Sequence, residues 1–457
     1  MNMPFKRKIT IQELIYYLLI GIIATIFFQQ VFVINIGGSF KIYELLSILL
    51  LLTFLFVDHQ RIYGKLSLIL FLFFVVLPTF GVIKYFLLPL PYDYYQRFPN
   101  ATNVLRTNII LAPLLLLVYY WFTWIVINYI ISSKLIYKNR DKILNLFITV
   151  ATIISLYNFY ALIFVKFLGF PDIIPSWLDF RNSPTYKTGR FGGFSDEPGT
   201  YVILQTWAVY YLVLGNIKIH RHKLVTLINI ISWVMTMSSL LIPGIIILII
   251  FLFKKNKKSR FKILISCIAI IISFIFFVKA YGIQSQVKYI AKEKLENYVK
   301  GADHTLDSGS YRNFTTRLGF RLFEDNFIFG TGPGTSCFYI WHYENQMGIQ
   351  TWGERITETT YPQNGYAKIA AEMGILGIGL FILFFCYLLK IELKNSSSSF
   401  VYTSLAGSIF VIIAYFTIYP ETSLFLWLNI ALACNTLYHH KTKHELKTRS
   451  QEYLLKE

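Results

Sequence analysis

The chain has 457 residues, of which 55% are hydrophobic, 18% aromatic and only 15% charged. Because a soluble protein of this size carries about 25% charged residues, the composition excludes an ordinary soluble enzyme. The net charge of +19 would suit a nucleic-acid partner. However, Lys and Arg gather in short segments between apolar runs, as they do in the cytoplasmic loops of membrane proteins. We therefore expect contact with anionic lipid and no nucleic-acid partner.

Apolar runs long enough to cross a bilayer recur along the chain. They fall near 10–34, 41–57, 66–88, 108–131, 143–168, 198–216, 223–238, 240–254, 261–279, 366–390, 399–418 and 421–438. The first run has no small-residue cleavage site after it, so we read it as a retained helix rather than a signal peptide.

The stretch 223–254 could form one long tilted helix or two short helices. Ser238, Ser239, Pro243 and Gly244 interrupt it, and basic clusters flank it on both sides. Two helices leave both clusters in the cytoplasm, as the positive-inside bias requires. The sequence therefore predicts an all-α polytopic membrane protein with about 12 transmembrane helices and both termini cytoplasmic.

The same count divides the chain into four parts. Residues 1–279 form a bundle of about nine helices with external loops 89–107 and 169–197, and residues 280–365 form a large extracytoplasmic loop. Residues 366–438 supply three C-terminal helices, and residues 439–457 a basic cytoplasmic tail. The large loop holds eight basic and nine acidic residues, a net charge of −1, so it is not a basic tail.

Two helices are expected inside the large loop. One is an amphipathic helix near 287–298. The other runs from Tyr311 to about Asn326, with Phe314, Leu318 and Leu322 on one face. The helix that returns to the membrane carries Ala370, Gly374 and Gly377, small residues that allow a neighbour to pack closely.

The segment 190–199 is Gly-rich and charged at the start of an apolar run. Arg190 could bind an anion beside the carboxylates of Asp196 and Glu197, and glycines around them let the backbone approach a ligand. The plainer reading is an interfacial salt bridge with helix capping. We assign Asp196 to a helix cap, and Arg190 and Glu197 to function.

Three arginines follow in the second helix of the large loop. Arg317 and Arg321 share a face, and Arg321 could simply pair with Asp325 four residues on. Arg317 is the best candidate for a plain surface residue. Arg312 lies at the start of the helix, the unfavourable end for a cation, which suggests that a bound anion compensates its charge.

Other polar positions in this loop allow two interpretations each. The glycines of segment 330–334 could bind phosphate through backbone amides or could simply end the helix. Gln363 and Asn364 could bind a sugar or cap the helix that follows. His304 and His342 are the histidines outside, and either could be a base. The four cysteines show no metal or disulfide spacing, so we expect no metal and no cofactor.

Taken together, these segments resemble the O-antigen polymerase (Wzy) branch of the O-antigen ligase/polymerase superfamily. The resemblance covers most of the chain and rests on the order of degenerate motifs. They are Arg190 with Phe194–Pro198, the interrupted segment 236–239, Arg312 upstream of 329–334, the ten-residue spacing from Arg321 to Gly332, and Gln363–Tyr366 before 372–377. In the ligase branch a His-Asn dyad stands before the late helix, whereas here Gln363 takes the His position, which favours a polymerase.

The resemblance implies transfer of a glycan from an undecaprenyl-pyrophosphate donor to a second lipid-linked repeat unit, at the outer face of the bacterial plasma membrane. It implies a metal-independent glycosyltransferase with Glu197, Arg190 and Arg312 as catalytic residues. Substrate binding would fall to Arg321, Gly332, Gln363, Asn364 and Tyr366. The partners would be the lipid-linked donor and acceptor, the bilayer and a chain-length regulator. The alternatives are an O-antigen-type ligase and a flippase or transporter for lipid-linked oligosaccharides.

Overall fold

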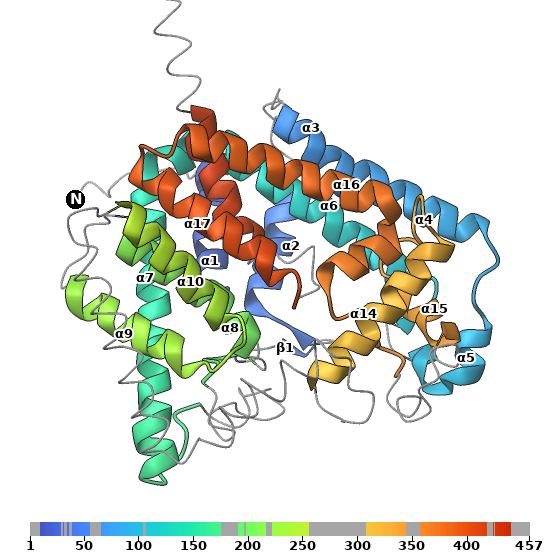
Figure 1. The fold of residues 1–457 in the computed structure, drawn as a ribbon, viewed down its shortest axis with the longest axis horizontal. Helices are drawn as coiled ribbons and strands as arrows, with labels where there is room; N and C mark the ends of the chain where they lie inside the picture. The colour runs from blue at the N-terminus through green and yellow to red at the C-terminus, as the bar shows by residue number, and fades with distance from the viewer. Residues whose placement is uncertain are drawn as a thin grey trace, which may run out of the picture.

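The computed structural model consists almost wholly of helices joined by short connections (Figure 1). It describes residues 10–28, 31, 34–35, 39–54, 65–103, 107–174, 191–195, 198–215, 222–255, 308–343, 357–417, 424 and 426–439. The predicted segments 261–279 and 287–298 lie outside these residues, as do Arg190, Asp196, Glu197 and His304. Within the described part, the prediction of an all-helical protein is confirmed, apart from one pair of two-residue strands.

The first half of the chain forms α1 (Ile11–Thr25), α2 (Ile42–Phe54), α3 (Lys65–Phe71), α4 (Leu77–Leu87), α5 (Asp93–Arg97), α6 (Leu111–Ser132) and α7 (Lys134–Tyr160). The strands β1 (Ile34–Asn35) and β2 (Ser39–Phe40) pair antiparallel between α1 and α2. Two π-helical segments continue helices rather than end them: η1 (Leu72–Val76) joins α3 to α4, and η4 (Ala161–Phe167) extends α7. A short 3-10 helix, η2 (Pro99–Asn103), follows α5.

The second half forms α8 (Pro198–Leu214), α9 (His222–Met235), α10 (Leu241–Lys255), α14 (Ser308–Asp325), α15 (Ser336–Tyr339), η8 (Ile340–Tyr343), α16 (Gly365–Lys394) and α17 (Ser399–Ala414). Residues 426–439 are helical as well. Helices therefore occupy every predicted apolar run that falls within the described residues. The predicted helix at 311–326 is confirmed as α14, with Phe314, Leu318 and Leu322 buried.

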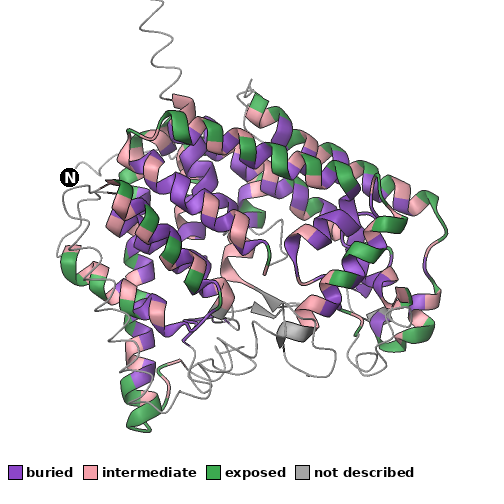
Figure 2. Cartoon of the chain, in the orientation of Figure 1, coloured by how far each residue is buried: buried purple, intermediate pink, exposed green. Residues whose placement is uncertain are grey.

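Four helical segments are long and apolar enough to cross a membrane: Lys65–Leu87, Leu111–Ser132, Lys134–Phe167 and Gly365–Lys394. Shorter apolar helices, among them α1, α8, α9 and α17, pack beside them. Much of the outer surface of α4 and α16 is exposed and apolar, whereas the faces turned toward other helices are buried (Figure 2). The chain is thus a helical membrane protein, and the total of about 12 spans stays a prediction.

The interrupted stretch 223–254 forms two helices, as predicted. α9 ends at Met235, Met237 has a positive φ of 47°, and α10 begins at Leu241. At the far end of α10, the Lys255 ammonium donates to the Leu214 carbonyl of α8 at 2.6 Å. The end of α10 therefore lies beside the end of α8.

The two ends of the bundle differ in character. At one, which we call the basic end, the hydroxyl of Ser399 also donates to Leu214, and Asn435 donates to the end of α6. Arg140, Lys255 and Lys394 belong to this end. At the other, which we call the loop end, the start of α16 meets the end of α17 through a Gly365 amide to Tyr415 carbonyl hydrogen bond of 2.7 Å. The predicted site residues that the structure describes lie on the elements of the loop end.

Candidate functional site

Helix α14 is fixed at the loop end by a tight contact with the start of α16. A Cβ placed on Gly319 would lie 2.8 Å from the Pro362 ring, so only glycine permits this approach. The Thr315 hydroxyl accepts a hydrogen bond from the backbone amide of Gln363 at 3.3 Å. Together with the buried Phe314 and Leu318, these contacts place Gln363 beside α14 at Thr315, three residues along the helix from Arg312.

The end of α17 and the turn after it accept four hydrogen bonds, three of them from predicted site residues. The Arg312 guanidinium donates to the Thr417 carbonyl at 2.6 Å, and the Asn364 side-chain amide donates to the Phe416 carbonyl at 3.2 Å. The Tyr366 hydroxyl donates to the Ile412 carbonyl at 2.7 Å. The Gly365 amide donates to the carbonyl of Tyr415. The structure thus brings Arg312, Asn364 and Tyr366 together around one helix end, with Gln363 adjacent.

This arrangement gives the Arg312 charge a partner within the protein. The C-terminal carbonyls of a helix are the negative end of its dipole and lack partners within the helix. The sequence argument considered only the field of α14 and could not include α17, because Thr417 lies 105 residues further along the chain. Arg312 is half-buried and acts as a cap on α17.

Asn364 and Tyr366 contribute to the fold through their polar atoms. The Asn364 side-chain oxygen accepts the amides of Tyr366 and Ala367, so Asn364 is the N-cap of α16. Its side-chain amide group donates a hydrogen bond to the Phe416 carbonyl. Of the predicted pair, Gln363 is therefore the residue whose side chain remains for a ligand, and Asn364 holds it in place.

The Gly-rich segment 330–336 is wrapped around α16 at a break in that helix. Gly374 has φ 66° and ψ −162° inside an otherwise helical run. The amides of Thr331 and Gly332 donate to the carbonyls of Ala371 and Glu372 at 2.8 and 2.9 Å. A Cβ on Gly330 would overlap the backbone of residues 372–373, and one on Gly374 would overlap the carbonyl of Ile328. Close packing at Gly374 was expected from the sequence, but the helix break was not.

The Glu372 carboxylate completes this clamp. It accepts the Gly334 amide at 2.9 Å and the Ser336 hydroxyl at 2.6 Å, and its side chain is 1% exposed. The Lys368 ammonium lies 3.9 Å away. The amides that a phosphate would need are therefore already bonded to α16. The segment acts as a structural clamp here, and substrate binding by Gly332 stays a prediction.

A second cation reaches the same segment from α4. The Lys84 ammonium donates to the carbonyl of Gly330 at 2.7 Å, and Gly81 lies against Pro333 one turn earlier. Lys84 and Glu372 were not among the predicted site residues. Both are charged residues inside apolar runs, and this was the signal that could have identified them.

Arg321 does not join the group around Arg312. Nine residues separate the two, about 13 Å along the helix axis. Arg321 is half-exposed and pairs with Glu324 rather than with Asp325. Asp325 instead accepts the Tyr343 hydroxyl at 2.6 Å. Arg317 is exposed, which agrees with the prediction of a plain surface residue.

The described part of the segment 190–199 forms a buried turn at the loop end. The Phe191 amide donates to the Met235 carbonyl at 3.1 Å, which ties the turn to the end of α9. Gly193 has φ 60°, and its amide donates to the Asn158 side chain at 3.1 Å. The turn ends at Ser195, shortly before α8 begins at Pro198, and a role for Arg190 and Glu197 beside it stays a prediction.

Below this turn lies a buried polar network between α7, α8 and α9. The Asn158 amide group donates to Ser232 at 2.9 Å, and the Gln205 amide group donates to Ser155 and Asn229. The Ser195 hydroxyl and the Gln205 carbonyl oxygen are buried without a hydrogen-bond partner among the described residues. Two polar atoms therefore remain for a ligand or water close to the turn.

Other reactive groups at the loop end fit structural roles. Burial raises the pKa of the Cys337 thiol to about 12, so it is not a thiolate nucleophile at neutral pH. His342 lies 3.2 Å from Asp93 and stacks on Trp341. Among the described residues, no group of three or more His, Cys, Asp or Glu side chains could hold a metal ion.

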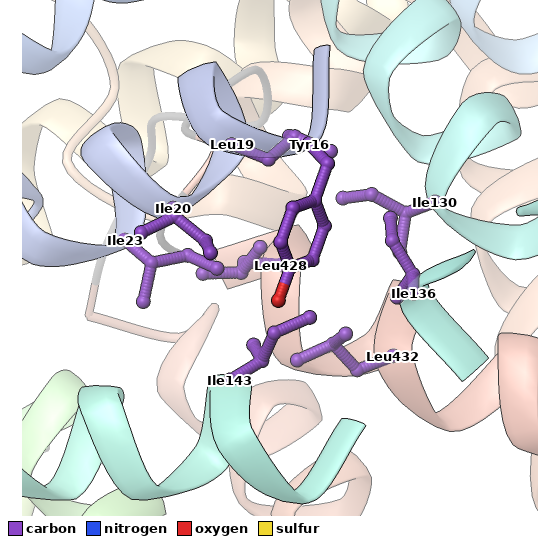
Figure 3. A pocket seen from close by; sticks show the side chains of 9 residues that line it. All are labelled: Tyr16, Leu19, Ile20, Ile23, Ile130, Ile136, Ile143, Leu428 and Leu432. Atoms are coloured by element: carbon purple, nitrogen blue, oxygen red, sulfur yellow. The ribbon is translucent and has the colours of Figure 1, made fainter. Parts of the chain in front are cut away.

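The small cavity that the structure shows lies away from these residues. It has a volume of about 10 Å³ and is lined by Tyr16 and aliphatic side chains from α1, α6, α7 and the helix at 426–439 (Figure 3). Ile130, Ile136 and Ile143 place it toward the basic end. Because its lining holds no charged group, it does not suit a pyrophosphate.

Comparison with known proteins gives one family match. Residues 224–382 match the family model described as O-antigen ligase. The matched region begins in α9 and ends within α16, so it includes Arg312, the clamp at 330–336 and the pair Gln363–Asn364. No curated protein matches the chain.

Proposed function

We propose that this chain is a polysaccharide polymerase of the O-antigen ligase/polymerase superfamily, a proposal that the match of residues 224–382 to the O-antigen ligase family model supports. It would join undecaprenyl-pyrophosphate-linked repeat units at the outer face of the plasma membrane. Enzymes of this family are glycosyltransferase-like and act on lipid-linked glycans in a membrane. The observation that carries the proposal is the group formed by Arg312, Gln363 and Tyr366 at the loop end of an apolar helical bundle.

Gln363 supports a polymerase over a ligase. It takes the position of the histidine in the ligase dyad, and a glutamine amide neither accepts nor releases a proton at physiological pH. Its backbone is fixed by Thr315 on one side and by the Asn364 cap on the other. The side chain can therefore orient a sugar by hydrogen bonds but cannot act as a general base.

The proposed reaction is a single displacement at an activated sugar. An acceptor hydroxyl forms a bond to the anomeric carbon of the donor glycan, and the bond from that carbon to the pyrophosphate oxygen breaks. The hydroxyl proton passes to Glu197, and polyprenyl pyrophosphate leaves. The pyrophosphate already activates the donor sugar, so the reaction needs no nucleotide and no redox cofactor.

Arginine suits the leaving group in this step. Guanidinium groups bind phosphate oxygens through paired hydrogen bonds and stabilise the charge that develops as the bond breaks. We assign this role to Arg190 and Arg312. The hydrogen bond to the Thr417 carbonyl holds the Arg312 guanidinium at the loop end. Arg321, Gly332, Gln363, Asn364 and Tyr366 would contribute to substrate binding, Asn364 through its hold on Gln363.

The proposal is tested with purified protein in vesicles supplied with a polyprenyl-pyrophosphate-linked repeat unit. A ladder of longer lipid-linked glycans supports the polymerase. Transfer of the glycan to a different acceptor would support a ligase, and translocation without a change in length would support a flippase. Arg312→Gln and Glu197→Gln should each lower the rate of ladder formation by about 10²-fold or more, as expected for loss of charge stabilisation or of a base.

Arg317→Gln is the matched control, because Arg317 lies on the same helix and is exposed. It should form ladders at the rate of the unmodified protein. Unchanged polymerisation by the Arg312 and Glu197 variants would place the catalytic groups elsewhere.

A further inference from the structure

The C-terminal part of α14 and the turn after it expose large apolar side chains. Phe320, Phe327 and Ile328 are 41%, 52% and 55% exposed. The Phe323 and Phe327 rings are 5.1 Å apart, so Phe327, in the turn just after α14, continues the apolar surface of the helix. At 100° per residue, Phe323 lies about 60° from Phe320 on one side, whereas Glu324, Arg321 and Asp325 lie roughly 40–140° round on the other. One flank of α14 is therefore apolar and the other charged.

This apolar flank is continuous with the outer surface of two candidate membrane spans. The Ile375 amide donates to the Phe327 carbonyl at 2.8 Å, and Ile375 and Leu376 are 39% and 43% exposed. On the other side, the Phe329 and Phe80 rings are 4.7 Å apart. Figure 2 shows exposed residues on α4, α14 and α16 at this side of the molecule. The turn thus lies between two surfaces that face lipid.

The lengths of the two spans give the depth of the turn. From Lys394 at the basic end, about 20 residues of α16 reach Gly374, a rise of about 30 Å, which is the thickness of the hydrocarbon core. From Lys65, a similar length of the α3–α4 helix reaches Lys84. Gly374 contacts Ile328, and Lys84 donates to Gly330. Both spans therefore place residues 327–330 at the boundary between hydrocarbon and headgroups.

From this geometry, we infer that Phe320, Phe327 and Ile328 insert into the leaflet at the loop end, with phospholipid acyl chains as their partner. Helix α14 then lies in the plane of the interface, as amphipathic helices with one apolar flank and one charged flank do. The inserted side chains anchor the segment that carries Arg312 at headgroup level. The inference concerns the seating of α14 and does not depend on the reaction proposed above.

The test uses a photoreactive benzoylphenylalanine in place of Phe327, a conservative aromatic replacement at an exposed position. The full chain is reconstituted in vesicles of phosphatidylethanolamine and phosphatidylglycerol with alkyne-tagged acyl chains. Asp325 is the matched control position: it is two residues away, is exposed, and accepts a hydrogen bond from Tyr343 on the charged side. Irradiation should give a lipid adduct at position 327 and only background at position 325.

A second measurement covers the case in which the photoreactive variant folds poorly. Ile328→Cys should react with a membrane-impermeant maleimide several-fold more slowly than Asp325→Cys in intact vesicles, as read by peptide mass. Equal labelling at the two positions, or an adduct of position 327 with another protein in place of lipid, would overturn the inference.

Discussion

Two irregular turns at the loop end are each held by one buried polar side chain, and they differ in what remains available for a ligand. In the segment 330–336, Glu372 takes the Gly334 amide and the Ser336 hydroxyl, and the neighbouring amides bond to α16. In the segment 191–195, Asn158 takes the Gly193 amide, but the buried Ser195 hydroxyl has no partner among the described residues. Glycine-rich sequence alone does not distinguish a clamp from a binding turn. Backbone amides of both turns have protein partners, so the Ser195 hydroxyl is the difference between them.

The largest effect is expected from glycines of the clamp. Gly330→Ala and Gly374→Ala each place a Cβ at positive φ into backbone atoms that have no room to move. Each should destabilise the protein by about 4 kcal/mol or more. Thermal unfolding in detergent and the yield of monodisperse protein measure the loss.

Gly379→Ala is the control on the same helix. A Cβ there would meet nothing within 4 Å. Since alanine is the better helix former, its stability should be equal to or slightly above that of the unmodified protein. A Gly374→Ala variant as stable as Gly379→Ala would contradict the described break in α16.

A smaller loss is expected from the clamp's carboxylate. Glu372→Gln leaves the buried Lys368 charge without its acidic neighbour and turns one acceptor oxygen into a donor facing other donors. Breaking a buried pair in this way costs about 3 kcal/mol. The double variant with Lys368→Met should recover part of that loss, and a double-variant cycle on the unfolding temperature tests it. A full sum of the two single losses would mean that the two side chains do not interact.

Asn158→Ala tests the second turn. It removes the acceptor of the Gly193 amide and the donor to Ser232, a loss of about 2 kcal/mol. If the turn positions Arg190 and Glu197, activity should fall far more than this stability loss explains, at temperatures where the variant is still folded. Comparison with Ser155→Ala, a change in the same network away from the turn, separates positioning from general destabilisation. Equal activity losses in the two variants would argue against a positioning role.

The smallest effect on stability is expected at Ser195. Because its hydroxyl is buried without a partner among the described residues, Ser195→Ala should change the unfolding free energy by less than about 0.5 kcal/mol. If the hydroxyl contacts substrate, the Michaelis constant should rise while the unfolding temperature stays constant. A strongly destabilised Ser195→Ala would show that the hydroxyl has a structural partner.

Local patterns in the sequence predicted the helices well. Apolar runs gave the spans, the spacing of Phe314, Leu318 and Leu322 gave α14, and the interruption at 236–239 gave two helices in place of one. These features depend on neighbours within a turn or two of the chain, and a periodic pattern records such neighbours.

Local sequence patterns did not predict the contacts between distant segments. The Arg312 partner at Thr417 and the Glu372 contact with Gly334 join residues 105 and 38 positions apart. No local pattern marks such pairs, so the sequence could not identify the end of α17 as a partner of Arg312. The π-helical segments and the break at Gly374 likewise depend on tertiary packing, since nothing in the run 365–394 except the glycine itself distinguishes that position.

The stoichiometry of the reaction tests the central claim most directly. Purified protein in vesicles would receive only the polyprenyl-pyrophosphate-linked repeat unit, and both the glycan length and the free polyprenyl pyrophosphate would be measured over time. A polymerase releases one polyprenyl pyrophosphate for each new glycosidic bond, with the growing chain still on lipid. Release without chain growth, or no release while the substrate crosses the membrane, would contradict the proposed function.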